Sequence, residues 1–491
     1  MKKVLAFILA ALMVLSLAAC QGGETTKAPE GDKTTVAPTE KPTEKPTDKP
    51  TDAPTEPVTP AEVIEVKYYC TVGAYLNRLQ ELVEEFNNGI GKEKGIKINL
   101  DSEINDSDTV FKANMEAGNY PDMFSSSSPN LEYYGKGYYV NLYDIDNAEM
   151  KELVAKRQPF IDLSPSVYSV PLDHFLTTLP LEVLPIKMPI NTDLFEEAGV
   201  EEPKTWDDVL VAAQKITELG KENTRGFGWS TWSAVWRRLT FKSTIPSARK
   251  AWWDPNTATY DWTQYRPVIE ALCKMYSEGW MIGADDLKID PIRNAFSDGQ
   301  VGMFISPAYD YSVFTNQFPA TCNWKFIDMP VYNEGNQYKG CYFTRGGDAI
   351  CGPAWEQADD AKKAAICTVY CYINGDYCVQ EIAKIGGIIT FPGEFPDLKL
   401  NDDLGEQFKQ MADTEGYYIV PVYPDGAISS KLEGDNYATV FSAVMHGEVT
   451  LDAAFTDLAT RYNAAYQAAK ADPDLAPNMA IYEYDYVFKG N

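Results

Sequence analysis

The sequence predicts an α/β protein with two lobes, each an open sheet flanked by helices. From about Val63 to residue 491 the composition is globular, and that stretch is longer than one compact core normally grows. β-Branched and aromatic segments alternate there with amphipathic helical patterns, which indicates strand–helix–strand units. The same alternation recurs in the middle of the chain, so a second sheet is expected.

The first lobe begins with three predicted strands. Residues 62–70 and 95–103 are rich in β-branched and aromatic side chains, and 109–128 reads as a helix, a turn and a third strand. Between the first two strands, residues 74–91 form an amphipathic helix with one apolar face: Leu76, Leu79, Leu82, Val83 and Phe86. Because ligands of open α/β sheets bind beyond the carboxyl ends of the strands, the residues that follow these strands are site candidates.

Residues 191–208, NTDLFEEAGVEEPKTWDD, predict a rigid helix–turn–helix corner. Asn191 or Thr192 caps a short helix that Gly199 ends, and Pro203 prevents its continuation. Thr205 then caps a second helix together with Asp208, three residues later. Trp206 is expected in the core.

The remaining elements follow the same style. We expect a strand at 226–229, the end of a hairpin at 256–264 and a helix at 266–281. A helix end, a turn and a strand follow over 294–309, and the last part is mostly helical, at 359–374 and 435–470. The globular part shows no internal repeat.

The N-terminus has the layout of a secretory signal. Two lysines precede an apolar run from Val4 to Ala19, which is short for a membrane span. The run ends in LAAC, which resembles the lipobox of bacterial lipoproteins, so residues 1–19 would be removed and the Cys20 thiol would carry a diacylglycerol. The alternative is an ordinary secretory signal that ends near a cysteine.

Residues 20–62 predict a disordered linker. They repeat the units TEKP, TEKP and TDKP and contain almost no large apolar side chain, so burial cannot offset the entropy of ordering. Proline favours extended chain, which at about 3 Å per residue would reach on the order of 100 Å. Such a tether suits a lipid-anchored protein at the extracellular face of a Gram-positive cell membrane, working within a thick wall.

Charge and cysteine content restrict the partners and the compartment. The net charge is −28, which disfavours nucleic acid and anionic lipid as partners. Beyond Cys20 there are eight cysteines, mostly in apolar segments. Reduced, buried thiols are favoured over disulfides, and outside a cell they would imply an anaerobic setting. No spacing predicts a metal site, and no cofactor is expected.

Seven motifs in one order resemble the extracellular solute-binding proteins of carbohydrate ABC transporters, the family of maltose-binding protein. They are PDMF…YYGKGYYVNL, YSVP, NTDLFEEAGVEEPKTWDDVLVAAQKIT, GFGW, AFSDGQVGMFISPAY, GGDAI and HGEVTLDAAFTDLATRYN. The chain departs from the family at Met188-Pro189-Ile190, where a Tyr-Asn pair is usual. The resemblance implies the type II periplasmic-binding-protein-like fold, with discontinuous lobes joined by hinge strands. Its lobes would comprise residues 63–172 with 322–390, and 173–321 with 391–491.

The resemblance also implies that a sugar or oligosaccharide binds in a cleft between the lobes. It further implies a monomeric protein that is not an enzyme and that delivers its ligand to the permease subunits of an ABC importer. Aromatic faces match the CH face of a sugar, and we expect a neutral ligand held by stacking. The aromatic candidates are Trp232, Tyr309 and Tyr311. For Trp232, a buried stripe with Trp229 and Trp236 is the alternative, and one of Trp252 and Trp253 is expected to face the ligand.

The polar candidates lie at strand ends, near the hinge and beside glycines: Thr71, Tyr75, Ser127, Ser128, Asp173, His174, Arg345 and Asp348. For each, a solvated loop residue is the alternative. Two other functions stay open. One is a surface glycoside hydrolase, which needs two carboxylates across the cleft although no hydrolase motif occurs. The other is a carbohydrate sensor or adhesin that keeps the binding fold without transport.

Overall fold

The computed structural model describes most of the chain from Val63 onward. The described residues are 63–70, 72–102, 107–126, 131–163, 169–170, 174–233, 235–283, 288–332, 340–420, 423–473, 475–479 and 482–483. The predicted signal peptide, Cys20 and the predicted linker lie outside them. Within the described part, no helix combines the length and apolarity needed to cross a membrane.

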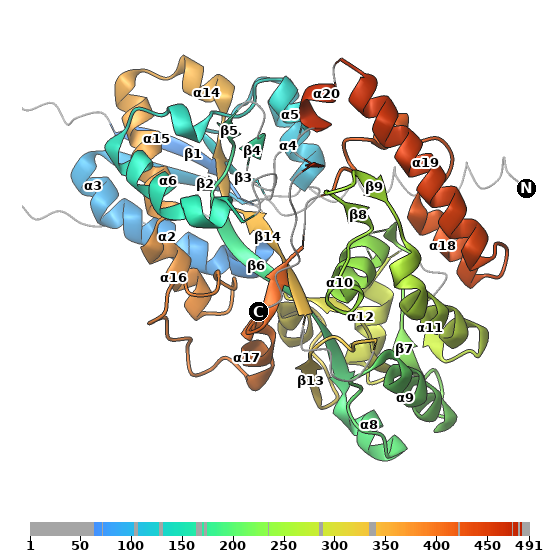
Figure 1. Ribbon diagram of the computed structural model, residues 1–491. Coiled ribbons are helices and arrows are strands. Elements are labelled where there is room, and N and C mark those ends of the chain that lie inside the picture. Colours follow the sequence, from blue (N-terminus) through green and yellow to red (C-terminus); the bar gives the residue numbers. More distant parts are fainter. Residues whose placement is uncertain are drawn as a thin grey trace, which may run out of the picture. The chain divides into compact units, whose positions relative to one another are not determined.

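The first sheet has four strands in the order β15-β3-β1-β2, and Figure 1 labels β3, β1 and β2 among them. Strand β1 (Ile64–Tyr69) runs parallel to β2 (Ile96–Asp101) and β3 (Met123–Ser125), while β15 (Asp348–Ile350) is antiparallel to β3. Helix α2 (Leu76–Asn88) contacts β2 through the predicted apolar face, and α15 (Asp360–Ile373) contacts β1. The three predicted strands and both helices are confirmed. The return of the chain at β15 completes this sheet from a distant segment.

The second sheet is built around β6 (Pro180–Asn191). Its order is β10 (Met281–Ile282), β7 (Arg225–Gly228), β11 (Val301–Met303), β6, β14 (Gly340–Gly346) and β16 (Tyr417–Ile419), and β12 (Ser306–Pro307) and β13 (Trp324–Ile327) also pair with β6. All 12 residues of β6 are buried. Its first half pairs with β14 and its second half with β13, both antiparallel.

Strand β6 passes from one hydrophobic core to the other. We call them the first core, which contains the side chains of β1 and α2, and the second core, which contains those of α9 and α11. Leu181 and Val183 belong to the first core, and Ile186 and Met188 belong to the second. On β14, the adjacent residues Tyr342 and Cys341 also belong to different cores, Tyr342 to the first and Cys341 to the second. Two adjacent strands therefore connect both cores.

The predicted corner at 191–208 is confirmed in detail. Helix α8 (Thr192–Ala198) is capped by the Asn191 side chain and ends at Gly199, whose φ of 62° is the left-handed conformation that glycine tolerates. Helix α9 (Trp206–Glu218) begins with a reciprocal capping box between Thr205 and Asp208. Trp206 is buried, as expected. The corner follows β6 directly and so fixes where the second core begins.

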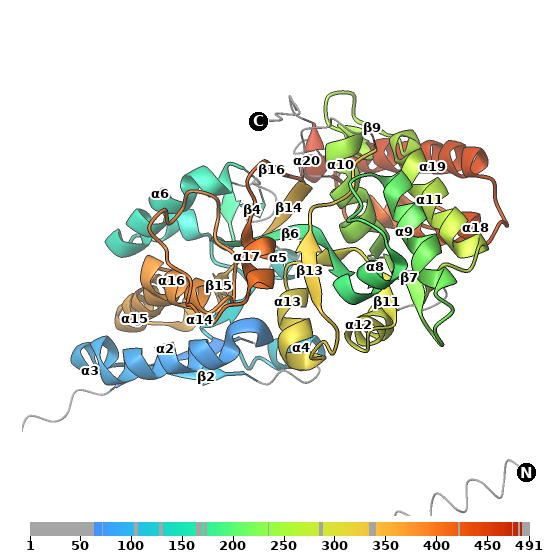
Figure 2. The same cartoon turned by 90° about the horizontal axis from the view of Figure 1, so that it is seen from below.

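The remaining helices cover the sheets. Figures 1 and 2 both show α9 beside β7 and α11 beside α9, in agreement with their contacts. Their bounds are α3 (Ile90–Lys94), α4 (Ser107–Glu116), α5 (Leu131–Gly135), α6 (Ala148–Ile161), α10 (Lys242–Ala248), α11 (Arg266–Ser277), α12 (Asp290–Ser297), α13 (Asp310–Ser312), α14 (Gly352–Gln357), α16 (Asp376–Lys384), α17 (Glu406–Ala412), α18 (Tyr437–Met445), α19 (Leu451–Ala471) and α20 (Ala476–Met479). Two small hairpins pair β4 (Ser169–Val170) with β5 (Phe175–Leu176) and β8 (Trp253–Asp254) with β9 (Thr259–Tyr260).

The cysteines beyond Cys20 are all free thiols. Cys70, Cys341, Cys351, Cys367 and Cys378 are buried, and the other three are half-buried. Burial raises the pKa of the Cys70 and Cys273 thiols to about 11, so both stay protonated at neutral pH. The prediction of reduced thiols over disulfides is confirmed.

Candidate functional site

A cavity of about 340 Å³ lies on the face of β6 and β14. Its walls come from segments that are far apart in the chain: Val72–Ala74 after β1, Ala308–Ser312 after β12, Gly386–Ile389 after α16, and Phe408 of α17. The cavity is within the size range of small-molecule sites in proteins. It lies where the loop after β1 and the loop after β12 meet, which is the strand-end position expected from the topology.

A buried ion pair forms part of the cavity floor. Glu182 and Arg345 are register partners on β6 and β14, and their side chains form a salt bridge. Glu182 is 3% exposed, whereas the Arg345 side chain is 25% exposed and lines the cavity. Burial raises the pKa of Glu182, and the Arg345 guanidinium opposes that shift. The pair presents both hydrogen-bond acceptors and a donor fork to anything in the cavity.

Two tyrosines from the segment after β12 also line the cavity. Tyr309 is 38% exposed, and the Arg293 guanidinium lies 5.5 Å from its ring centroid. Tyr311 packs edge-on against Phe408, with ring centroids 5.1 Å apart. A π-helical segment, η6 (Val313–Gln317), follows the two tyrosines directly. Short π-helical segments are frequently found at functional sites.

A buried polar network holds the Tyr309 loop in place. Asp310 is fully buried and accepts hydrogen bonds from the Ser306 hydroxyl, at 2.7 Å, and from Arg293, at 2.5 Å. Arg293 also pairs with Asp290 on α12. Because each of these charges has a partner, the loop is anchored to α12, and the Tyr309 ring is positioned by rigid surroundings.

The structure brings three predicted site residues together at the cavity: Tyr309, Tyr311 and Arg345. A fourth, Tyr75, lies next to the wall but is only 6% exposed. A Cβ added to Gly387, a wall residue, would come 2.7 Å from the Tyr75 Cβ. Tyr75 therefore supports the cavity and does not line it in this conformation.

Asp348 and His174 do not line the cavity. Asp348 is buried and accepts hydrogen bonds from the Tyr68 hydroxyl, at 2.8 Å, and from the Asn374 amide, at 3.1 Å. Burial raises its pKa to about 6. His174 is exposed with a φ of 48° and stacks on Tyr143 at 4.4 Å.

The tryptophans divide into core and surface. Trp229 and Trp236 are buried and pack edge-on, while Trp232 between them is 43% exposed and is not part of the 340 Å³ cavity. The expectation that Trp252 or Trp253 faces the ligand is wrong. Both side chains are buried, and their indole N–H groups are used inside the fold. The Trp252 indole donates to Asp425 and the Trp253 indole donates to the Tyr482 carbonyl.

Four further candidates lie outside the described residues: Thr71, Ser127, Ser128 and Asp173. Sequence reasoning missed Glu182 and Phe408. A signal for Glu182 exists, because it is the one acid in the apolar run LPLEVLPIKMPI, and a charge inside a buried strand needs a partner. Phe408 carries no such signal, since its contact with Tyr311 depends on tertiary packing.

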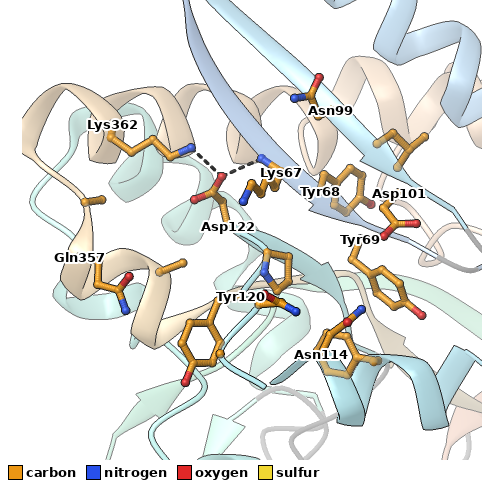
Figure 3. A pocket seen from close by; sticks show the side chains of 17 residues that line it. Lys67, Tyr68, Tyr69, Asn99, Asp101, Asn114, Tyr120, Asp122, Gln357 and Lys362 are labelled. Carbon is orange, nitrogen blue, oxygen red and sulfur yellow. Dashed lines mark hydrogen bonds and ion pairs between the residues drawn. The ribbon is translucent and has the colours of Figure 1, made fainter. Parts of the chain in front are cut away.

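A second, larger cavity of about 760 Å³ lies over β1 and β2, between α4 and α14 (Figure 3). Asp122 at its base accepts hydrogen bonds from the Lys67 backbone N–H, at 2.7 Å, and from Lys362 on α15, at 2.6 Å. This ion pair ties α15 to the first sheet. The cavity contains none of the predicted site residues, and among the described residues no cluster of His, Cys, Asp and Glu could hold a metal ion.

Solved structures with the same fold are numerous. An ABC substrate-binding protein from Listeria monocytogenes in complex with cycloalternan matches with a TM-score of 0.58 at 19% identity, covering 81% of this chain and 98% of that one. A solute-binding protein from Thermotoga lettingae bound with α-D-tagatose gives 0.59 at 18% identity, covering 82% and 100%. The apo-form of RafE from Streptococcus pneumoniae gives 0.58 at 16% identity, covering 83% and 99%.

These similarities confirm the predicted two-lobed type II periplasmic-binding-protein-like fold, and at such identities they establish the fold alone. No curated protein matches the sequence. The family model for bacterial extracellular solute-binding proteins matches residues 73–348, a span that runs from the cavity wall after β1 to β15 and exceeds half of the chain. This protein is therefore a member of the bacterial extracellular solute-binding protein family.

Proposed function

We propose that the protein captures a sugar or oligosaccharide in the cavity on β6 and β14 and delivers it to an ABC importer. The observation that carries this proposal is that Tyr309 and Tyr311 line the same cavity as the Glu182–Arg345 pair. Aromatic faces suit the CH surface of a sugar ring, and a charged donor–acceptor pair suits its hydroxyls. The solved complexes of the Listeria and Thermotoga proteins support a saccharide as ligand class.

The lobes in this proposal are those expected from the sequence: residues 63–172 with 322–390, and residues 173–321 with 391–491. The cavity takes walls from both, since Val72–Ala74 belong to the first and Tyr309 to the second. Strands β6 and β14 run through both hydrophobic cores and would act as the hinge. The protein would work as a monomer that meets the permease subunits in its closed, loaded form.

Anchoring through Cys20 is the second part of the proposal. LAAC at the end of an apolar run supports it, as does the extended Thr/Pro/Lys/acid-rich linker that follows. In a Cys20→Ala variant, the protein should appear in the culture medium or accumulate as an unprocessed precursor. Immunoblots of membrane and medium fractions measure this, and a processed variant that stays with the membrane would contradict the lipid anchor.

The rival function is a surface glycoside hydrolase. Catalysis by that route needs two carboxylates about 5 to 10 Å apart. Among the described residues that line the cavity, Glu182 is the only acid, and it is committed to Arg345. This observation favours binding over hydrolysis.

A calorimetric screen against a glycan panel tests the proposed function, followed by chromatography of each glycan after prolonged incubation. The expected result is saturable 1:1 binding of at least one sugar, which is recovered intact. Shortened glycans would instead assign hydrolysis, and an absence of binding across sugars together with binding of a non-sugar solute would reject the ligand class. The sensor or adhesin alternative predicts the same binding, but deletion of the permease would then leave uptake of that sugar unchanged.

A further inference from the structure

A buried lysine packs on β14, the strand that carries Arg345 of the cavity, and has no acidic partner among the described residues. Lys242, the first residue of α10, is 8% exposed. Its ammonium lies 4.8 Å from the ring centroid of Phe343 and 5.1 Å from that of Tyr423. Among the described residues, no carboxylate oxygen lies within 4.0 Å of it. A buried ammonium is costly when unpaired, so this position calls for an anion.

The strand geometry connects Lys242 to the cavity. Side chains two residues apart on a strand share a face, so Phe343 lies on the same face of β14 as Arg345. The register partner of Phe343 is Leu184, and both Leu184 and Arg345 line the cavity. Helix α10 packs on this strand, and the Cys341 thiol donates to the Lys242 carbonyl. The Lys242 ammonium, which lies over the Phe343 ring, is therefore on the same face of β14 as Arg345, displaced along the strand toward α10.

A second cation accompanies Lys242. Arg237 lies five residues earlier, in the π-helical segment η4 (Val235–Phe241) that directly precedes α10 and contacts it. Arg237 is partly buried, and among the described residues it forms no salt bridge within 4.0 Å. Both cations interact electrostatically with the carboxylate of Asp425.

Asp425 does not neutralise the pair. Its carboxylate accepts hydrogen bonds from the Trp252 indole, at 3.1 Å, and from the Tyr260 hydroxyl, at 2.9 Å. Burial raises the pKa of Asp425, while its hydrogen bonds from Trp252 and Tyr260 and the charges of both cations oppose that shift. Two cations thus face one carboxylate whose oxygens are already engaged. In a chain with a net charge of −28, this is a local excess of positive charge beside the binding cavity.

We propose that Lys242 and Arg237 form an anion subsite of the sugar-binding cavity, and that the ligand is an acidic saccharide carrying a carboxylate, such as a uronic acid residue. This inference rests on the proposed function and makes its substrate class more specific. It also departs from the expectation of a neutral ligand, which was drawn from the aromatic content, the overall acidic charge and the family resemblance together. The net charge of the whole chain does not determine the local charge around Lys242 and Arg237, where two cations lie near the Asp425 carboxylate.

Matched charged and neutral ligands test the subsite without any substitution. We would titrate the protein calorimetrically with a trigalacturonic acid, with its fully methyl-esterified form, and with a sulfated neutral trisaccharide. The acidic trisaccharide should bind at least about 30-fold more tightly than its ester, because a buried charge pair that loses one partner typically costs at least about 2 kcal/mol. The sulfated ligand distinguishes a general anion site from a carboxylate site.

The variant Lys242→Met keeps most of the side-chain volume and removes the charge. It should lose the preference for the acid over the ester, while Lys215→Met on the exposed face of α9 should keep it. Without ligand, Lys242→Met should be at least as stable as the wild type to urea, because the charge it removes is unpaired. If Lys242 served only to support Asp425, the variant would be less stable and the preference would be unchanged.

The outcomes separate the two proposals. Equal affinity of the wild type for the acid and the ester would overturn the anion subsite while leaving sugar capture in place. A preference for the sulfated ligand over the uronate would overturn the carboxylate assignment. Failure of every saccharide, charged or neutral, would reject the proposed function itself.

Discussion

At the scale of single residues, the site depends on side chains whose orientation is fixed by what lies beneath them. Tyr309 is held between the Arg293 guanidinium and the cavity, and Arg345 is held by Glu182. Such support keeps the Tyr309 ring and the Arg345 guanidinium in position before a ligand arrives, which lowers the entropic cost of ordering them on binding. The exposed part of each residue can then contribute to recognition.

Replacement of Tyr309 by alanine should weaken sugar binding. The loss of one stacked face is expected to cost about 1–3 kcal/mol, or about 5- to 150-fold in Kd, with Asp310 and Arg293 left intact. Isothermal titration with the sugar identified in the glycan screen measures the change. Tyr377→Ala is a suitable control because Tyr377 is 52% exposed on α16 and does not line the cavity. Equal affinity for both variants would remove Tyr309 from the site.

Asp348 makes the stability of the fold depend on pH. Burial raises its pKa from 3.8 to about 6, so the folded protein binds a proton more tightly there than the unfolded chain does. The associated stability is fully present below pH 3.8 and is lost as the pH rises through 6, by about 3 kcal/mol in total. Urea unfolding at several pH values between 3.5 and 7 should show this loss. An Asp348→Asn variant should lack this component, and a parallel pH profile in the two proteins would contradict the assignment.

At the scale of elements, local sequence chemistry predicted most boundaries. The capping signals at Asn191 and Thr205 and the glycine stop at Gly199 act within a few residues, so they can be read directly from the chain. The full extent of β6 was less readable. It contains Pro180, Pro185 and Pro189, which normally argue against a central strand. Its pairing with β14 and β13 depends on segments more than a hundred residues away.

In the candidate site, too, some residues could be predicted from local sequence motifs and others depend on contacts between distant segments. Tyr309, Tyr311 and Arg345 were predicted because they follow or lie beside recognisable motifs. The pairing of Glu182 with Arg345 and the position of Lys242 over Phe343 come from tertiary contacts between strands and α10, for which no local pattern exists. Asp348 was expected to contact the ligand because it follows two glycines. Its carboxylate instead accepts hydrogen bonds from Tyr68 and Asn374 in the interior of the fold.

The capping box of α9 should have a measurable share in stability. Thr205→Ala removes the hydroxyl that accepts the Asp208 N–H, and we expect a loss of about 1 kcal/mol in the free energy of unfolding. Urea unfolding gives the difference. Thr460→Ala on α19 is the control. Among the described residues, the exposed Thr460 hydroxyl donates to the Thr456 carbonyl of its own helix, and its loss should change stability by no more than about 0.5 kcal/mol. Equal effects would show that the cap contributes nothing specific.

At the scale of the whole molecule, we expect the proposed lobes to close on the ligand by rotation about β6 and β14. Small-angle scattering of the chain from residue 63 to residue 491 should give a smaller radius of gyration with saturating sugar than without it. An unchanged radius despite tight binding would remove the clamp mechanism and leave binding itself intact. The Tyr309→Ala variant offers a control, because its radius should shrink only at proportionally higher sugar concentration.

The placement of β15 has a consequence for how the chain matures. Strands β1, β2 and β3 are made early, but their sheet is completed only by β15 at Asp348–Ile350, and β1 is covered by α15 still later in the chain. A polypeptide that threads through a secretion pore N-terminus first would hold these strands without their last partner until most of it had crossed. Non-local pairing of this kind slows folding. If the chain is exported as we propose, the topology would leave completion of the first sheet until Asp348–Ile350 had crossed the membrane.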